Sequence, residues 1–120
     1  MSVNPSQLDL ITRLLDVAAV RQRVISQNVA NVNTPGYRRQ EVAFEDELCA
    51  ALESGQVDAL RTLAPQVIYT EGLPERSDGN NVDVDVEIGQ LTKNGLLFET
   101  YSQILATKLG MIRSAISGQG

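Results

Sequence analysis

The chain has 120 residues, a formal net charge of −5, no tryptophan and no histidine. This length allows one domain, and the missing tryptophan removes a usual large contributor to a compact core. The acidic balance and the scattered Lys and Arg argue against nucleic acid as a main partner. The absence of histidine removes the commonest general base and metal ligand.

The beginning of the chain does not resemble a cleaved secretion signal. Residues 1–6 carry no positive charge, and the apolar stretch that follows is interrupted by Arg13, Asp16 and Arg21. No apolar run approaches the length of a membrane span. We therefore expect neither a cleaved signal peptide nor direct insertion into a membrane.

Residues 7–33 have the hydrophobic spacing of a long helix. Apolar residues recur at alternating intervals of three and four, with one break at Gln22, which is typical of a heptad seam. The seam residues are Leu8, Ile11, Leu15, Ala18, Ile25, Val29 and Val32. The residues of a second row beside the seam are Leu10, Leu14, Val17 and Val24.

An asparagine-rich segment, SQNVANVNTPGY (residues 26–37), ends this helix. Thr34 precedes a proline and is therefore disfavoured in the helical region. Pro35 and Gly36 fit the centre of a type II turn, in which glycine supplies a positive φ. Each residue alone is compatible with an ordinary helix stop, but the complete string is more specific.

The middle, residues 34–86, has no single periodicity. Phe44, Leu48 and Leu52 predict a short amphipathic helix ending near Gly55, and residues 57–63 are compatible with a weaker one. The single cysteine, Cys49, would be a small buried side chain on the first of these helices.

Residues 66–70 predict a short extended segment, and residues 77–81 predict an exposed turn. In residues 82–87 valines alternate with acidic residues. This alternation favours either a short strand or an extended lead into a C-terminal helix, whose positive end would attract the carboxylates.

Residues 87–117 repeat the heptad spacing and predict a second long helix. Its seam residues are Ile88, Leu91, Gly95, Phe98, Ser102, Leu105, Leu109, Ile112 and Ile116. A further row consists of Leu97, Tyr101, Ile104, Met111 and Ala115. The expected fold is mainly α, with a coiled-coil-like pair of terminal helices joined by an irregular middle with a short helix and short extended segments.

Both long helices carry more apolar surface than a two-helix hairpin can cover. One explanation is a three- or four-helix bundle in which the middle covers the second rows. We favour packing against neighbouring copies or related subunits, because the middle offers little helix to do the covering.

Candidate chemistry is sparse. The acidic stretch from Asp78 fails the EF-hand template, since Asp83 stands where glycine is needed and Gly89 where glutamate is needed. No Ser–base or Cys–base arrangement is recognisable, so we expect no enzymatic activity, metal or cofactor. The arginines expected to form exposed or inter-subunit ion pairs are Arg21, Arg23, Arg38 and Arg39.

Two segments of the sequence resemble the axial proteins of the bacterial flagellum. The asparagine-rich segment is similar to the element that rod, hook and hook-associated proteins carry after their N-terminal helix; its signature residues are Asn28, Ala30, Asn31, Asn33, Thr34, Pro35, Gly36 and Tyr37. The block DGNNVDVDVEIGQLTKNGLLF is similar to a stretch typical of proximal rod proteins; its signature residues are Asp78, Gly79, Asn80, Val82 and Asp83.

The resemblance implies a structural subunit of the flagellar basal body rod, the drive shaft between the membrane ring and the hook. It implies export through the flagellar type III apparatus without signal cleavage, followed by assembly in the periplasm. The implied partners are copies of itself, other rod subunits and the adaptor between the rod and the membrane ring. A coiled-coil secretion chaperone or adaptor is the alternative, although it would need neither signature segment.

Overall fold

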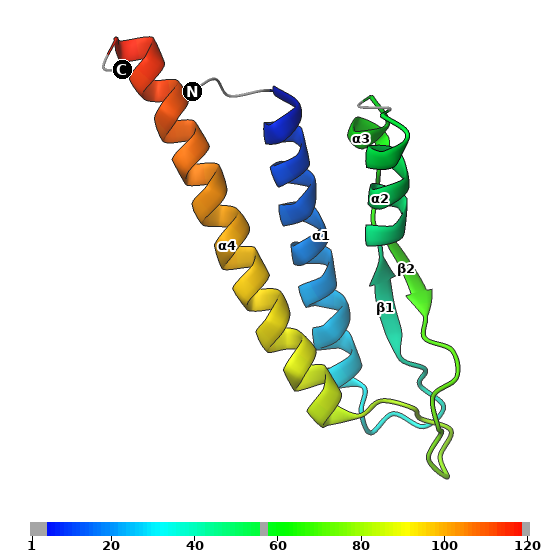
Figure 1. Ribbon diagram of the computed structural model, residues 1–120. Helices are drawn as coiled ribbons and strands as arrows, with labels where there is room; N and C mark the ends of the chain where they lie inside the picture. Colours follow the sequence, from blue (N-terminus) through cyan, green and yellow to red (C-terminus); the bar gives the residue numbers. More distant parts are fainter. Residues whose placement is uncertain (1–4, 56–57, 119–120) are drawn as a thin grey trace.

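The computed structural model describes residues 5–55 and 58–118. The elements in chain order are α1 (Pro5–Ala30), β1 (Gln40–Ala43), α2 (Glu45–Glu53), α3 (Ala59–Thr62), β2 (Gln66–Tyr69) and α4 (Val84–Ser117). The two long terminal helices run side by side in opposite directions, and a small strand pair and two short helices lie between them in the chain (Figure 1). The predicted mainly helical fold is confirmed.

Helix α1 is the central element of the molecule. It packs against α4 on one side and against β1 and α3 on the other (Figure 1). The shape is elongated, with extents of 64 × 29 × 15 Å. Among the described residues, no helix combines the length and apolar character that crossing a membrane requires.

Both long helices differ from the predicted ranges of 7–33 and 87–117. Helix α1 begins at Pro5, because proline is tolerated in a first turn. It ends at Ala30, because the chain then tightens into turns in which the Thr34 amide donates to the Asn31 carbonyl at 3.0 Å. Helix α4 begins at Val84, because the Asp83 carboxylate accepts a capping bond from the Asp85 amide at 3.0 Å.

The middle contains the short helix and the extended segment that its sequence predicts, at α2 and β2. The weaker helix is reduced to α3; residue 57 of its predicted range lies outside the described residues. Strand β1 was not predicted. It pairs antiparallel with β2, with Val42 opposite Val67. Cys49 is exposed on α2, so its expected burial was wrong.

The apolar core lies between α1 and the segment in which β1 is followed by α2. Val17 and Val24 of α1 pack against Val42 and Phe44, and all four side chains are buried. The second apolar row of α1 is therefore covered within the chain. We expected neighbouring molecules to cover this row, because the middle of the chain offers little helix. That expectation was wrong for α1, because strand β1 and Phe44 cover the row instead.

On α4, polar residues occupy part of the face that meets α1. Glu87 and Asn94 are buried, whereas Phe98 and Leu109 of the predicted seam are about half exposed. Asn94 Nδ2 donates to the Ala18 carbonyl at 2.8 Å and so fixes this register. The remaining seam residues divide into three groups. Ile11, Ala18 and Ile25 are buried; the half-buried ones are Leu8, Leu15, Val29, Val32, Leu91, Ser102, Leu105 and Ile112; and Ile88, Gly95 and Ile116 are exposed.

Replacement of Phe44 by alanine should lower the free energy of unfolding by about 3–5 kcal/mol, because it opens a cavity beside Val17 and Val24. Urea denaturation of the purified chain measures the loss. Leu52→Ala, at an exposed position on α2, is the control and should cost less than about 1 kcal/mol. Equal losses for the two variants would contradict the location of the core.

Candidate functional site

The two signature segments, about fifty residues apart in the sequence, meet where α1 ends and α4 begins (Figure 1). The Gly36 amide donates to the Asp78 carbonyl at 2.8 Å. The buried Asn80 side chain donates through Nδ2 to the carbonyls of Asn31 and Thr34, each at 2.9 Å. We call this meeting point the junction: residues 28–41 and 76–87 and the contacts between them.

Two glycines allow the signature segments to approach closely. The Tyr37 amide donates to the Thr34 carbonyl at 3.2 Å, and Gly36 has a φ of +75°, which confirms the predicted type II geometry. Gly79 has a φ of +83°, and a Cβ atom placed there would lie 3.4 Å from the Gly36 Cα. A side chain at Gly79 would therefore strain the backbone and press on the opposite turn.

Asn28 is the central side chain of the junction, and it is completely buried. Its Nδ2 donates to the Gln40 carbonyl at 2.8 Å and to Glu87 Oε2 at 3.2 Å. Its Oδ1 accepts bonds from the Tyr37 hydroxyl at 3.0 Å and from the Gln40 amide at 3.1 Å. One amide side chain thus ties together α1, the turn after it, β1 and the first turn of α4.

A buried ion pair lies beside Asn28. The Arg39 guanidinium binds Glu87, and it also donates through Nη1 to Thr70 Oγ1 at 2.8 Å and to Glu41 Oε2 at 3.2 Å. Glu87 is completely buried, so removing the Arg39 charge would leave the Glu87 carboxylate buried without compensation. Our expectation of exposed or inter-subunit pairing was wrong for Arg39, because three segments of the same chain surround it.

The other arginine predictions have mixed outcomes. Arg38 forms an exposed ion pair with Glu75 at 2.8 Å, and Arg21 pairs with Glu45 at 2.7 Å within the chain. Arg23 is exposed. In the described residues, no group of three His, Cys, Asp or Glu is placed to hold a metal ion.

Some signature residues face solvent at the junction. The exposed members are Ala30, Asn33, Thr34, Pro35, Gly36, Asp78 and Asp83. By contrast, Asn28, Asn80 and Val82 are buried, and Asn31, Tyr37 and Gly79 are half-buried. Sequence reasoning did not identify Asn81 and Glu87, and it placed Arg39 in an exposed or inter-subunit ion pair. The alternation of valines and acidic residues in residues 82–87 predicted that every acidic residue is an exposed charge at a helix end, so it gave no indication that Glu87 is buried.

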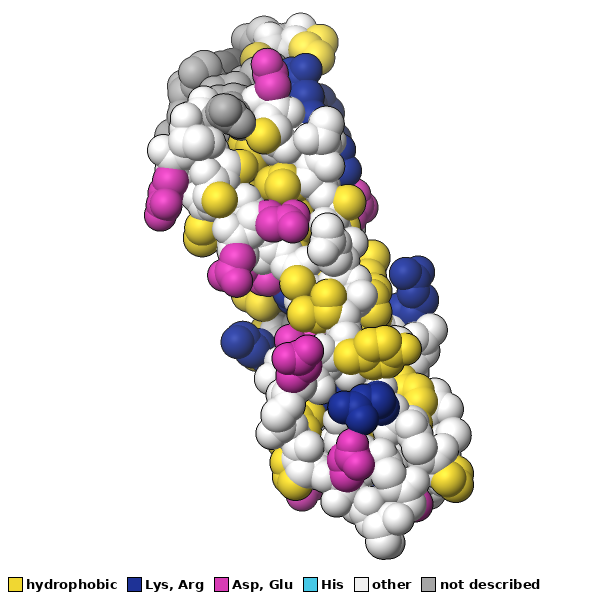
Figure 2. Space-filling model, turned by 90° about the vertical axis from the view of Figure 1, so that its right-hand side faces the viewer, with side chains coloured by type: hydrophobic (Ala, Val, Ile, Leu, Met, Phe, Trp, Pro, Cys, Tyr) yellow, Lys and Arg dark blue, Asp and Glu magenta, His cyan; other side chains and the backbone are white. Residues whose placement is uncertain are grey.

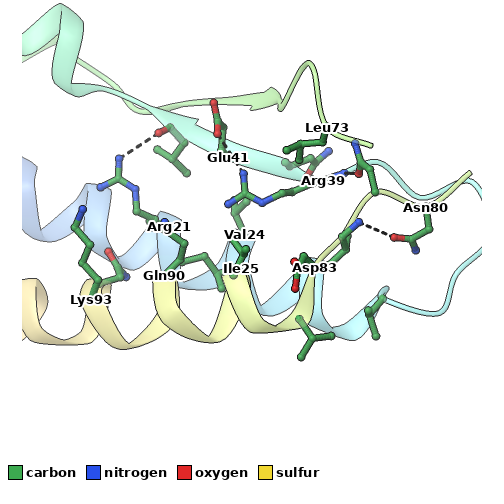
Figure 3. A pocket seen from close by; sticks show the side chains of 18 of the residues that line it. Arg21, Val24, Ile25, Arg39, Glu41, Leu73, Asn80, Asp83, Gln90 and Lys93 are labelled. Carbon is green, nitrogen blue, oxygen red and sulfur yellow. Dashed lines mark hydrogen bonds and ion pairs between the residues drawn. The ribbon is translucent and has the colours of Figure 1, made fainter. Parts of the chain in front are cut away.

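A groove of about 860 Å³ lies next to the junction, between α1, β1, residues 73–76 and the start of α4 (Figure 3). Figure 3 shows Arg21 and Lys93 toward one end of the groove and Asn80 toward the other. Asn81 and Asn94 also line it and are buried, and in the described part of the chain Asn81 Nδ2 and Asn94 Oδ1 have no hydrogen-bond partner.

Asn28→Ala should lower the free energy of unfolding by about 2–3 kcal/mol, because it leaves buried partners at Gln40 and Glu87 without their hydrogen bonds. Chemical denaturation measures this change. The exposed neighbour Asn33 provides the matched control, and Asn33→Ala should have little effect. A loss in Asn33→Ala as large as that in Asn28→Ala would count against the junction.

Deprotonation of the Tyr37 hydroxyl should lower the stability of the fold at alkaline pH. Burial raises the pKa of Tyr37 above its ordinary value, and Glu87 and Tyr69 raise it further. The folded chain therefore keeps this proton at pH values where the unfolded chain begins to lose it. The protonated Tyr37 hydroxyl makes its full contribution to the free energy of unfolding below about pH 10. That contribution is lost as the pH rises through the raised pKa of the folded chain. Denaturation between pH 8 and 11 should show a smaller decline for Tyr37→Phe than for the natural chain; parallel declines would contradict the assignment.

Comparisons with known proteins agree with the two signature segments. A family described as flagella basal body rod protein matches residues 15–38. The chain is similar to proteins called flagellar basal body rod protein FlgB. It is 32% identical to that of Borrelia hermsii over 88% of this chain and 92% of the relative. It is 26% identical to that of Bacillus subtilis over 98% of each chain, and 30% identical to that of Escherichia coli K12 over 88% of this chain and 80% of the relative. The chain therefore belongs to the FlgB family of flagellar basal body rod proteins.

Proposed function

We propose that this chain is a structural subunit of the proximal rod of the flagellar basal body. Its terminal helices would assemble with neighbouring subunits into the shaft that transmits torque from the motor to the hook. The relatives of similar length, which carry the basal body rod name, support this role. The single structural observation that carries it is the exposure of apolar side chains on two sides of the elongated molecule.

The first group of exposed apolar side chains runs along α4, with Leu96 on the opposite face of the helix from Phe98, Leu109 and Ile116. Leu96 and Ile116 are 62% and 82% exposed, and Phe98 and Leu109 are about half exposed. Covering such side chains with a neighbouring molecule stabilises the assembly by roughly 25 cal/mol per Å² of apolar surface that is removed from water.

The second exposed apolar surface lies on the side of β2 and α2, separated from α4 by α1 (Figure 1). Val67, Ile68 and Tyr69 of β2 and Leu52 of α2 are exposed there. Figure 2 views the molecule from this side and shows hydrophobic side chains spread along its length among acidic and basic ones. A subunit in the wall of a tube needs contacts on two sides, and these surfaces supply them.

The chain would be exported without signal cleavage through the flagellar export apparatus and would assemble in the periplasm. Copies of itself, other rod subunits and the adaptor to the membrane ring would be its neighbours. We do not favour a secretion chaperone, because the junction uses both rod-like signature segments for internal structure. Proteins that catalyse reactions need convergent titratable groups, and the two buried charged groups of the junction, Arg39 and Glu87, are engaged with one another.

Deletion of the gene should abolish motility, and restoring the natural chain should return both motility and the protein to purified basal bodies. Leu96→Asp should fail to restore motility, because it places a charge on the exposed surface of α4 while leaving the free energy of unfolding within about 0.5 kcal/mol. Leu96→Met keeps the apolar surface and serves as the control. Normal incorporation of Leu96→Asp into basal bodies would contradict the role of this surface.

A further inference from the structure

We propose that the outer edge of β2 binds an extended segment of a different protein chain, which adds a third strand to the β1–β2 sheet. The proposal rests on the role as a rod subunit and names one contact through which the subunit would meet a non-identical neighbour. We call the outward-facing backbone groups of Val67 and Tyr69 the free edge.

Strand β1 cannot accept a further strand, because side chains of α1 occupy its outer edge. Asn28 bonds both the amide and the carbonyl of Gln40, at 3.1 and 2.8 Å. Arg21 Nη2 donates to the Val42 carbonyl at 3.1 Å. On this side of the sheet, α1 thus supplies the hydrogen bonds that another strand would otherwise make.

The register of the strand pair fixes the direction of the backbone groups in β2. Gln40 lies opposite Tyr69. In an antiparallel pair, opposed residues that do not bond each other point their amides and carbonyls away from the partner strand. Because the groups of Gln40 point to α1, those of Tyr69, and of Val67 two positions earlier, point away from β1. The Thr70 amide agrees with this alternation, since it donates to the Arg39 carbonyl at 3.0 Å.

The free edge is uncovered. Strand β2 lies farther from α1 than β1 does, on the outer side of the molecule (Figure 1). Among the described residues, no side chain caps the amide or carbonyl of Val67 or Tyr69 as Asn28 caps Gln40. Exposed strand edges are commonly protected by a charged side chain, a proline or a bulge within the strand. The four residues of β2, QVIY, contain neither a charge nor a proline, and all four are exposed.

The backbone groups of the free edge define the chemistry of the partner. The outward groups of Val67 and Tyr69 are two residues apart, which is the hydrogen-bonding repeat of another strand. A helix does not match them, because it uses its own amides and carbonyls internally. Val67, Ile68 and Tyr69 are between 40% and 61% exposed. The matching segment is therefore extended and has apolar side chains beside these three.

The charge next to the free edge is negative. Residues 63–75 contain Glu71 and Glu75 and no basic residue. Glu75 forms an ion pair with Arg38 at 2.8 Å. No cation of the described residues lies within ion-pair distance of Glu71. The bound segment should therefore carry a lysine or arginine beside Glu71, at the end of β2.

A second copy of this chain does not suit the free edge. In the described part of the chain, the other strand is β1, whose outer edge α1 occupies. Two copies would have to join β2 to β2, and a contact between identical surfaces closes as a dimer. Such a dimer would consume the edge in both copies and end growth in that direction. We therefore assign the edge to a non-identical chain.

Hydrogen exchange, read at single residues of the purified full-length chain, tests the edge directly. The probe is a short synthetic peptide of alternating valine and threonine that ends in two lysines. At millimolar concentration it should slow exchange of the Val67 and Tyr69 amides at least about fivefold and leave the Ile68 and Thr70 amides unchanged. The same peptide with methylated backbone nitrogens is the control and should protect none of them. Equal slowing by both peptides, or by neither, would overturn the proposal.

A charge exchange tests the predicted basic residue of the partner with the same readout. Glu71→Lys should weaken binding of the lysine-ended peptide at least about threefold, because like charges then meet. A peptide of the same alternation that ends in two glutamates should bind this variant better than it binds the natural chain. Identical binding in all combinations would overturn the assigned charge of the partner.

A proline exchange tests the edge in the assembled structure. Val67→Pro removes one outward amide, so the pairing with β1 and the urea midpoint should be kept. Ile68→Pro removes an inward amide and should lower the midpoint. Val67→Pro should reduce the amount of the chain in purified basal bodies at least about fivefold, whereas Val67→Thr keeps the amide and should be incorporated normally. Equal incorporation of Val67→Pro and the natural chain would overturn the edge contact.

Two further outcomes separate this inference from its alternatives. Dimers of the natural chain in sedimentation that Val67→Pro abolishes would show a second copy at the free edge and overturn the assignment to a different chain. Normal incorporation of Val67→Pro into basal bodies would overturn the edge contact and leave the rod role standing. Absence of even the natural chain from basal bodies would overturn the rod role itself.

Discussion

The buried contact of Asn28 and Arg39 with Glu87 is the interaction on which the arrangement of the chain depends. It joins the end of α1, the beginning of β1 and the first turn of α4. Most of the apolar core lies on the other side of α1, between Val17, Val24 and Phe44. The polar contacts, rather than the apolar ones, therefore fix where the second long helix starts and how it is rotated against the first.

This division between polar and apolar contacts explains why so much apolar surface stays in water. Asn94 and Glu87 occupy inward positions of α4, whereas Leu96 lies on the opposite side of the helix and Phe98, one turn after Asn94, stays about half exposed. A buried polar layer usually stabilises less than an apolar one of the same size, but it tolerates fewer alternative registers. The apolar side chains that are not buried within the chain thus remain exposed in a defined arrangement, where neighbouring molecules can cover them.

The sequence was sufficient for the features that depend on local spacing. Heptads located both long helices, and the Pro35–Gly36 pair located a turn whose φ angle agrees. Features that depend on distant partners could not be predicted. Strand β1 forms because Asn28 satisfies both the amide and the carbonyl of Gln40, and the burial of Glu87 requires Arg39. Composition cannot show that a charge has a partner 48 positions away.

The separation of these partners along the chain also determines the order of folding. Asn28 must wait for Glu87, 59 residues later, before its hydrogen bonds are complete. Contacts between distant residues form slowly, because the entropy of closing a long loop is lost before the contact forms. The first half of the polypeptide, emerging alone, would have no partner for its central asparagine. That first half nevertheless contains every residue of the apolar core, so the core needs only residues 17–44, whereas the polar junction is completed when α4 is present.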